Sequence, residues 1–370
     1  MTRLDSGSIK GRGAKALKGR GAESNPAVRF DAWQRERDAL DPAPDDELPG
    51  TPKTVFTLRD ARSIISRNAS PDVPFSQSIN PYQGCEHGCI YCYARPSHAY
   101  LGLSAGLDFE TRLFGKRNAA ELLRRELGKP GYKCELIALG ANTDPYQPVE
   151  REQRITRGIL EVLFEHRHPV GIVTKSSLVE RDIDLLAEMS RHNLAQVFVS
   201  ITTLDGDLAR KLEPRAVTPQ RRVETLRRLS AAGVRCGVLT APVIPFVNDG
   251  HIETILECAA QAGAQAAGFV ILRLPREVRP LFSDWLERHF PLRAAHVLAR
   301  VDDLHAGAEN KFEFGERMRG SGEYAKLLHR RFDIACRRLG LNSGERGGLE
   351  TGLFRVAVSP ARQGAQMSLF

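Results

Sequence analysis

The chain is most informative at Gln83-Gly84-Cys85-Glu86-His87-Gly88-Cys89-Ile90-Tyr91-Cys92-Tyr93. Its three cysteines, at C-x3-C-x2-C spacing, supply three thiolates to one small volume. A 4Fe–4S cluster normally takes four cysteine thiolates, so a set of three leaves one iron open for an exogenous ligand. The spacing therefore predicts a 4Fe–4S cluster held by Cys85, Cys89 and Cys92, with the two glycines of the run relieving the backbone crowding around it.

Two other interpretations fit a loop rich in cysteine. A zinc knuckle would add His87 or His98 as the fourth ligand, but structural zinc sites more often pair distant C-x2-C units, and the chain has no second pair. Disulfides are disfavoured because an odd cysteine count without a secretory signal indicates a reducing compartment. The other cysteines lie among apolar residues and are expected in the core: Cys134, Cys236, Cys258 and Cys336.

Composition narrows the class of protein. The chain has 370 residues, of which 42% are hydrophobic, and can hold one large α/β domain with extensions, or two domains. No apolar run approaches the roughly 20 residues of a membrane helix, and the start, Met1 to Ser6, has no apolar signal-peptide core. We therefore expect a cytoplasmic protein with no membrane partner. The formal charge of +8 favours a polyanionic partner.

The first 52 residues lack the pattern of a packed domain. Lys10-Gly11-Arg12-Gly13-Ala14 recurs as Lys18-Gly19-Arg20-Gly21-Ala22, and glycine with basic residues predicts a flexible basic arm. The acidic, proline-rich stretch 38–52 is typical of a linker. The arm could contact phosphate groups or serve only as a solubilising tail.

Residues 53–290 alternate short apolar runs with amphipathic stretches. Strands are expected at 75–80, 135–140, 170–174, 196–201, 234–240 and 267–272, and helices at 151–166, 181–191, 219–232 and 251–262. This order predicts an α/β fold with a parallel sheet and right-handed crossovers. Six strands make an incomplete barrel, and chemistry is expected at the carboxyl ends of the strands.

The C-terminal part is expected to be a mostly helical extension over residues 291–358. Helical periodicity marks 283–289, 296–305 and 322–339. A last apolar run at 353–358 is expected to form an edge strand. The polar tail, 359–370, is expected to be flexible.

Polar side chains at the strand ends are candidates for holding a cofactor: Asn142, Thr143, Lys175, Ser200 and Arg215. Lys175 and Arg215 could pair with a cofactor carboxylate, and Ser200 offers a hydroxyl to a carboxylate or a ribose. Asn142 and Asp144 could instead form a turn and cap the following helix. Arg273, after the last strand, could face the substrate.

The cysteine run, the stretch 174–176 and Ser200 together resemble the radical S-adenosylmethionine (radical SAM) superfamily, in the branch of spore photoproduct lyase and its uncharacterised relatives. The resemblance covers about residues 75–290 and implies the (β/α)6 partial barrel of that family. It implies Tyr91 and Tyr93 as catalytic residues, with Tyr93 as the hydrogen relay. It implies cofactor contacts at Tyr91, Thr143, Lys175 and Ser200.

One position departs from the lyase pattern. The lyase has a hydrogen-donor cysteine three residues before the acidic residue that ends strand two. Asp144 fixes that count, and Ala141 stands at the donor position. Cys134 lies at the opposite end of the strand. The radical chemistry therefore carries over, but photoproduct repair as such does not.

The resemblance also implies a reaction and partners. A reduced 4Fe–4S cluster cleaves S-adenosylmethionine, and the 5′-deoxyadenosyl radical abstracts hydrogen from the substrate, while the protein orients the reactants and excludes solvent. An electron donor such as a flavodoxin or ferredoxin is implied. The expected substrate is DNA, in a repair-linked reaction. The alternatives are protein, RNA or a small molecule, or a zinc-stabilised nucleic-acid-binding adaptor.

The chain ends in Gln366-Met367-Ser368-Leu369-Phe370. This pattern resembles the peptide with which bacterial polymerases and repair proteins bind the replication sliding clamp. Gln366 would supply hydrogen bonds, and Met367, Leu369 and Phe370 would anchor in an apolar groove. The tail could instead fold back on its own domain. The motif favours clamp binding, and with it DNA as the substrate.

Overall fold

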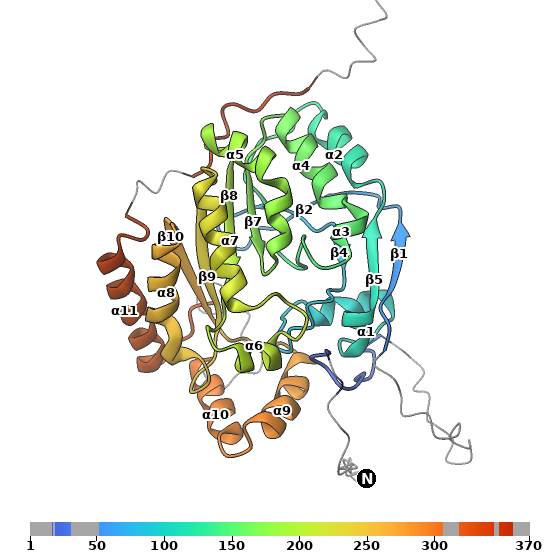
Figure 1. Cartoon of the computed structure of the whole chain (residues 1–370). Coiled ribbons are helices and arrows are strands. Elements are labelled where there is room, and N and C mark those ends of the chain that lie inside the picture. The colour runs from blue at the N-terminus through green and yellow to red at the C-terminus, as the bar shows by residue number, and fades with distance from the viewer. Residues whose placement is uncertain (1–16, 18, 31–51, 306–317, 344–347, 358–370) are drawn as a thin grey trace, which may run out of the picture.

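The computed structural model describes residues 17, 19–30, 52–305, 318–343 and 348–357. A seven-stranded sheet of order β10-β9-β8-β7-β6-β3-β2 lies beside a three-stranded sheet of order β1-β5-β4 (Figure 1). The strands are β1 (Val55–Arg59), β2 (Ile65–Arg67), β3 (Gln77–Ile79), β4 (Tyr82–Gln83), β5 (Arg112–Lys116), β6 (Ile137–Leu139), β7 (Val170–Thr174), β8 (Ala195–Ser200), β9 (Cys236–Val243) and β10 (Ala266–Ile271).

The large sheet confirms the predicted α/β partial barrel. β3 and β6 to β10 run parallel in chain order, and all six were predicted. β2 adds an antiparallel edge to β3. Among the described residues β10 does not pair with β2, so the sheet stays open. The sequence did not reveal β1, β2, β4 and β5, because segments of two to five residues give little periodicity.

Helices connect the parallel strands and cover the sheet (Figure 1). They are α1 (Leu107–Thr111), α2 (Ala119–Leu127), α3 (Glu150–Gln153), α4 (Ile155–Glu165), α5 (Ile183–Arg191), α6 (Gly206–Leu212), α7 (Pro219–Ala231), α8 (Ile252–Gln261), α9 (Val278–His289), α10 (Ala294–Leu304) and α11 (Gly322–Leu339). Three short 3-10 helices span Arg95–Leu101, Ser177–Asp182 and Asp249–His251. The predicted helix over 151–166 is divided between α3 and α4, because Arg154 adopts a left-handed φ of 51°.

The core lies between the sheet and its crossover helices. Strand residues such as Ile172 and Val197 are fully buried, as are Ile159 and Leu163 on one face of α4. These faces pair because an amphipathic helix and a buried strand both remove apolar area from water when they pack. The carboxyl ends of the strands are thereby held in a fixed array.

The C-terminal helices extend this body in two directions. α11 packs on α8 beside β10 and adds Phe332 to the main core (Figure 1). α9 and α10 form a second apolar cluster with α6, in which Trp285 stacks on Phe282 at 5.3 Å and its indole N–H donates to the Lys211 carbonyl at 3.0 Å. The predicted helices of this region are confirmed. None of the helices in the described part is long and apolar enough to cross a membrane.

The expected edge strand at 353–358 is wrong for its described residues. Residues 353–357 form no strand, and residue 358 lies outside the described part. The Phe354 ring instead packs against Tyr132 at 5.4 Å and His168 at 5.5 Å, and the Arg355 amide donates to the His166 carbonyl at 3.0 Å. The packing of one aromatic ring and a hydrogen bond, rather than a strand ladder, hold this segment.

Part of the expected flexible arm is packed. Residues 19–30, here called the N-terminal strap, include Arg20 and Ala22, which are 6% and 1% exposed. The expectation of an unpacked arm therefore does not hold for the strap. The first copy of the repeat, 10–14, and the linker from 38 to 51 lie outside the described residues.

Candidate active site

The cysteine loop follows β4 and is fixed by backbone hydrogen bonds. The Cys85 amide donates to the Phe109 carbonyl at 2.9 Å, and the Ile90 amide donates to the Leu212 carbonyl at 3.1 Å. Gly84 has a φ of +78°, and a Cβ there would lie 2.7 Å from a Leu113 methyl carbon. The glycine is therefore required by backbone geometry and by close packing together.

The three cysteine thiols lie within electrostatic reach of one another. Burial raises the pKa of Cys85 well above its usual range, and Asp144, Cys89 and Cys92 raise that pKa further. Cys85 and Cys89 are buried, while Cys92 is partly exposed. One loop thus brings together the three thiols that the sequence predicted as ligands.

The geometry does not favour a single metal ion. Among the described residues, no three His, Cys, Asp or Glu side chains converge closely enough to hold one. The His87 Nδ1 lies 3.3 Å from Asp144, and the His98 Nε2 lies 3.0 Å from the Arg112 carbonyl oxygen, so both histidines have other partners. A 4Fe–4S cube spreads its thiolates more widely than one ion does, and the donor set fits the cube better than zinc.

Lys175 is directed into a polar cluster at the carboxyl ends of neighbouring strands. Its Nζ donates to the Ser200 hydroxyl at 2.6 Å and to the Ala241 carbonyl at 3.4 Å, and it forms an ion pair with Glu213 at 3.4 Å. It also lies 5.8 Å from the centre of the Tyr91 ring. Two residues predicted from successive strand ends, Lys175 and Ser200, are therefore in contact.

Glu213 is the centre of this cluster, and sequence reasoning missed it. Its carboxylate accepts hydrogen bonds from the Tyr91 hydroxyl, from the Thr202 hydroxyl at 2.5 Å and from Arg222. Burial acts to raise the Glu213 pKa, but Arg222 and Lys175 outweigh it and hold that pKa far below its ordinary value. The carboxylate is therefore ionised. We call Tyr91, Lys175, Ser200, Thr202, Glu213 and Arg222 the Glu213 cluster.

The Glu213 cluster adjoins the thiols. After burial, the largest effects on the Cys89 pKa are a rise caused by Glu213 and a smaller opposing effect of Lys175. Tyr91 belongs to both groups: it lies between Cys89 and Cys92 in the chain, and its hydroxyl donates to Glu213. The loop and the strand ends thus form one continuous site.

Three predicted cofactor residues lie apart from the Glu213 cluster. The buried Thr143 hydroxyl donates to the Tyr82 carbonyl at 2.8 Å, and the Asn142 side-chain amide lies 3.5 Å from the Ser97 hydroxyl. Arg215 pairs with Glu86 at 3.0 Å on the cysteine loop. Their contacts support the loop and the strand end.

Asp144 fastens two strand ends together. Its carboxylate accepts from the Thr174 hydroxyl at 2.7 Å, from the Lys175 amide at 2.8 Å and from the Tyr146 amide at 2.8 Å. The bond from the Tyr146 amide shows that Asp144 takes the turn-capping role, which the sequence analysis left open. Asp144 also meets His87, so it ties β6 and β7 to the cysteine loop.

Tyr93 and Arg273 lie at the mouth of the partial barrel. The Tyr93 ring is 53% exposed, and its hydroxyl donates to the carbonyl of Ala141, the position where the lyase has its donor cysteine. Arg273 lies near enough to Tyr93 to interact electrostatically with its hydroxyl. The Arg273 guanidinium also reaches Met318 Sδ at 3.4 Å. The structure brings Tyr93 and Arg273 to one place, whereas Tyr91, the third predicted catalytic residue, lies in the Glu213 cluster.

A buried ion pair beneath the cysteine loop was not foreseen. Glu110 is fully buried, pairs with Arg95, and accepts from the Gly21 amide at 3.0 Å and the Ala22 amide at 2.8 Å. Arg95 in turn donates to the Cys89 carbonyl at 3.0 Å. The N-terminal strap is therefore coupled to the loop through Glu110 and Arg95.

This fold and this site define a radical SAM protein. A family model described as the radical SAM superfamily matches residues 79–259, and the chain belongs to that superfamily. Members use a 4Fe–4S cluster and S-adenosylmethionine, and so does this chain.

Three relatives illustrate the range of similarity. An uncharacterised protein of Mycobacterium tuberculosis is 36% identical over 74% of this chain and 85% of its own length. An uncharacterised protein of Methanocaldococcus jannaschii is 28% identical over 58% of this chain and 76% of its own length. A protein of Pseudomonas phage M6 named radical SAM Nalpha-GlyT isomerase is 26% identical over 68% of this chain and 52% of its own length.

Solved structures of spore photoproduct lyase share the fold. A mutant of that lyase superposes with a TM-score of 0.55 at 15% identity, over 77% of this chain and 80% of the lyase chain. The lyase complexed with a dinucleoside spore photoproduct superposes with a TM-score of 0.53, also at 15% identity and with the same coverage. The branch that the sequence resembles is thus matched in fold.

Proposed function

We propose that this radical SAM enzyme acts on DNA, in a repair-linked reaction of the lyase type. The observation that carries the proposal is the shared fold with spore photoproduct lyase, of which one solved complex holds a dinucleoside lesion. The formal charge of +8 supports a polyanionic substrate. Ala141 in the donor position separates the proposed reaction from photoproduct repair itself.

Each part of the site has a proposed task. Cys85, Cys89 and Cys92 would hold the cluster, which supplies the electron that cleaves S-adenosylmethionine to a 5′-deoxyadenosyl radical. Lys175 would pair with the carboxylate of S-adenosylmethionine, and Ser200 would bind the carboxylate or the ribose. Burial around the thiols excludes water and oxygen from the reacting groups.

Glu213 is proposed as a positioning residue. Its ion pair directs the Lys175 ammonium, and its hydrogen bond holds the hydroxyl of Tyr91, a residue that lies between Cys89 and Cys92 in the chain. Because Arg222 shares the carboxylate, Glu213 stays charged even though it is buried. Such preorganisation reduces the reorganisation that cofactor binding would otherwise require.

Tyr93 is proposed to face the substrate. It stands over Ala141, close to Arg273, and half of its surface is exposed at the barrel mouth. A phenolic hydroxyl there can relay a hydrogen atom, which is the role that the resemblance implies for this position. Arg273 would contact an anionic part of the substrate.

A second reaction class is favoured by one comparison. The similar phage protein is named as an isomerase, and an isomerisation can return the abstracted hydrogen to its product without a separate donor. A radical rearrangement would therefore fit Ala141. The substrate could then be a protein, RNA or a small molecule rather than DNA.

Substrate-stimulated cleavage tests the substrate class. The cluster-loaded, reduced enzyme is incubated anaerobically with S-adenosylmethionine and either irradiated DNA, undamaged DNA, RNA or a peptide mixture. We expect irradiated DNA to raise 5′-deoxyadenosine formation most. Stimulation only by RNA or peptide would reject DNA and favour the second class.

We also propose two protein partners. Residues 366–370, which lie outside the described part, would bind the sliding clamp through Leu369 and Phe370 as anchors. A flavodoxin or ferredoxin would reduce the cluster. The clamp would bring the enzyme to replicating DNA, and the electron donor would serve its cluster.

A further inference from the structure

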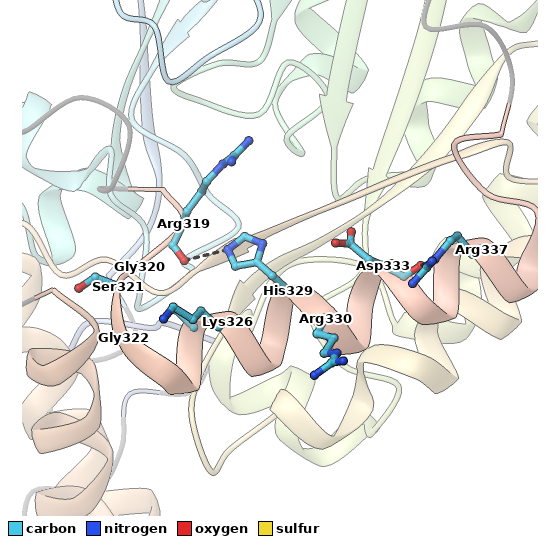
Figure 2. Close-up of a pocket in the computed structure, with 10 residues that line it drawn as sticks. Arg319, Gly320, Ser321, Gly322, Lys326, His329, Arg330, Asp333 and Arg337 are labelled. Carbon is cyan, nitrogen blue, oxygen red and sulfur yellow. Dashed lines mark hydrogen bonds between the residues drawn. The ribbon is translucent and has the colours of Figure 1, made fainter.

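An open groove runs along α11, away from the site described above. Its walls include Arg319, Lys326, Arg330 and Arg337, and one carboxylate, Asp333 (Figure 2). The helical positions 326, 330, 333 and 337 follow i, i+4 and i+3 spacing, so they form one stripe on the solvent face. The opposite face of α11 packs into the core. The groove thus carries mainly positive charge on a rigid 18-residue helix.

These cations are little used within the described part of the chain. No described carboxylate forms an ion pair with Arg319, Arg330 or Arg337, although Arg337 Nε donates to the Asp333 backbone carbonyl at 3.3 Å. Lys326, in contrast, pairs with Glu323 at 2.7 Å. Exposed arginines that line one groove without anionic partners give it a positive potential, which a polyanion would neutralise.

The groove begins at the mouth of the barrel. His329 Nε2 lies 3.0 Å from the Arg319 carbonyl oxygen and fixes the end of the groove (Figure 2). Gly320 is so close to β10 that a Cβ there would lie 3.0 Å from a methyl carbon of Ile271, the last residue of that strand. Met318, next in the chain, contacts Arg273. The groove therefore leads outward from the proposed substrate position.

We propose that the α11 groove binds the phosphate backbone of DNA that flanks the reacting nucleotide. The inference rests on the proposed function, and it adds a second contact surface to it. Eighteen helical residues span about 27 Å, and a strand advances roughly 3.4 Å per nucleotide along the duplex axis. The groove is therefore long enough for several phosphates, and arginine suits phosphate because its planar fork donates two hydrogen bonds.

Salt-dependent binding of undamaged DNA tests the proposal. The probe is a labelled duplex of about 30 base pairs, titrated between about 50 and 200 mM salt. The groove variant Arg319→Ser/Arg330→Ser/Arg337→Ser is compared with the control variant Arg62→Ser/Arg125→Ser/Arg151→Ser, which removes three exposed arginines that do not line the groove. Both variants lose the same formal charge.

The groove variant should bind roughly 10- to 100-fold more weakly near 100 mM salt, and its negative slope of log K against log salt should become shallower by roughly 0.9 per lost contact. The control variant should stay close to the wild type. Asp333→Asn should tighten binding, because it removes the one anion from the groove. A gain of affinity cannot come from misfolding, so this single variant keeps the test valid if the groove variant is unstable.

Equal losses of DNA affinity in the groove and control variants would overturn the proposal that the groove binds DNA. So would the absence of a gain in affinity in Asp333→Asn. Tighter binding of an RNA duplex, lost in the groove variant, would overturn DNA as its ligand. The proposed function is measured separately, by radical formation on DNA. If the groove variant binds DNA more weakly as expected but the enzyme forms no radical on DNA, the proposed function alone is rejected. If the enzyme reacts with DNA but the groove variant binds it as tightly as the wild type, the groove proposal alone is rejected.

Discussion

At the scale of single residues, the site depends on one carboxylate that no sequence pattern predicts. Glu213 stands between an apolar helix end and a proline, and nothing in that pattern separates it from a surface glutamate. Its importance comes from Arg222, nine residues further on, and from Tyr91 and Lys175, which reach it from distant parts of the chain. Lys175 and Ser200 were predictable, because strand ends can be located from periodicity. The carboxylate that pairs with Lys175 was not.

Lys175→Ala should weaken S-adenosylmethionine binding by roughly 1.5–3 kcal/mol, the range of a hydrogen bond to a charged group. Glu213 would also lose a neutralising neighbour. Equilibrium binding to the cluster-loaded protein measures the effect, with iron content as the check on the cluster. Lys129→Ala, an exposed lysine at the end of α2, is the control. Unchanged affinity in Lys175→Ala would contradict the proposed contact.

His168 should make stability depend on pH. The side chain is fully buried against Tyr132, and burial lowers the His168 pKa to about 4, against about 6.5 in the unfolded chain. Between these values the unfolded state binds more protons. The free energy of unfolding therefore falls as the pH falls through this window, by up to about 1.4 kcal/mol per pH unit and about 3 kcal/mol in all.

Urea unfolding of the wild type and His168→Gln between pH 7 and pH 5 measures this. The variant loses packing at every pH, but its stability should fall less steeply on acidification. Comparing slopes removes contributions that the two proteins share. Parallel slopes would show that His168 does not titrate as its burial requires.

At the scale of elements, the parallel strands and crossover helices follow from sequence periodicity, and the strap does not. Each of the six parallel strands carries its own apolar pattern. The strap is held by bonds from the Gly21 and Ala22 amides to Glu110, 89 and 88 residues further along the chain. A glycine-rich basic segment looks flexible until its distant acceptor is known. The same limit applies to 353–357, whose apolar run suggested a strand but whose Phe354 is a single anchor.

Gly21→Ala tests the strap. A Cβ at Gly21 would lie 1.8 Å from the Gly88 carbonyl oxygen in the cysteine loop. The strap or the loop must shift, at a cost of about 1–3 kcal/mol typical of overpacking. We expect a lower thermal midpoint and faster iron release to a chelator. Gly250→Ala, where a Cβ meets nothing within 4 Å, is the control. Wild-type behaviour in both variants would contradict the coupling of strap and loop.

At the scale of the whole molecule, one body presents three separate surfaces. The thiols and the Glu213 cluster lie at the carboxyl ends of the strands, the α11 groove is lined by side chains of α11 (Figure 2), and the tail follows the last described segment in the chain. The first two are built by the fold, whereas the tail motif is a matter of sequence alone.

The tail should bind the sliding clamp without the rest of the chain. A peptide of the last dozen or so residues is expected to bind with modest affinity, because ordering a short segment opposes docking. Leu369→Ala/Phe370→Ala should remove clamp binding from the full chain and leave S-adenosylmethionine cleavage unchanged. Loss of both activities would indicate that the tail packs on its own domain, and no binding by peptide or protein would reject the clamp.

Transfer of deuterium from DNA to 5′-deoxyadenosine tests the central claim most directly. The cluster-loaded enzyme is reduced anaerobically with S-adenosylmethionine and irradiated DNA whose nucleosides carry deuterium, and 5′-deoxyadenosine is analysed by mass spectrometry. Cys89→Ala, which removes one predicted cluster ligand, is the control and should give no 5′-deoxyadenosine. Deuterated 5′-deoxyadenosine from the wild type alone is the predicted result. Unlabelled 5′-deoxyadenosine from every deuterated DNA would contradict DNA as the substrate, and its formation by Cys89→Ala would contradict the site.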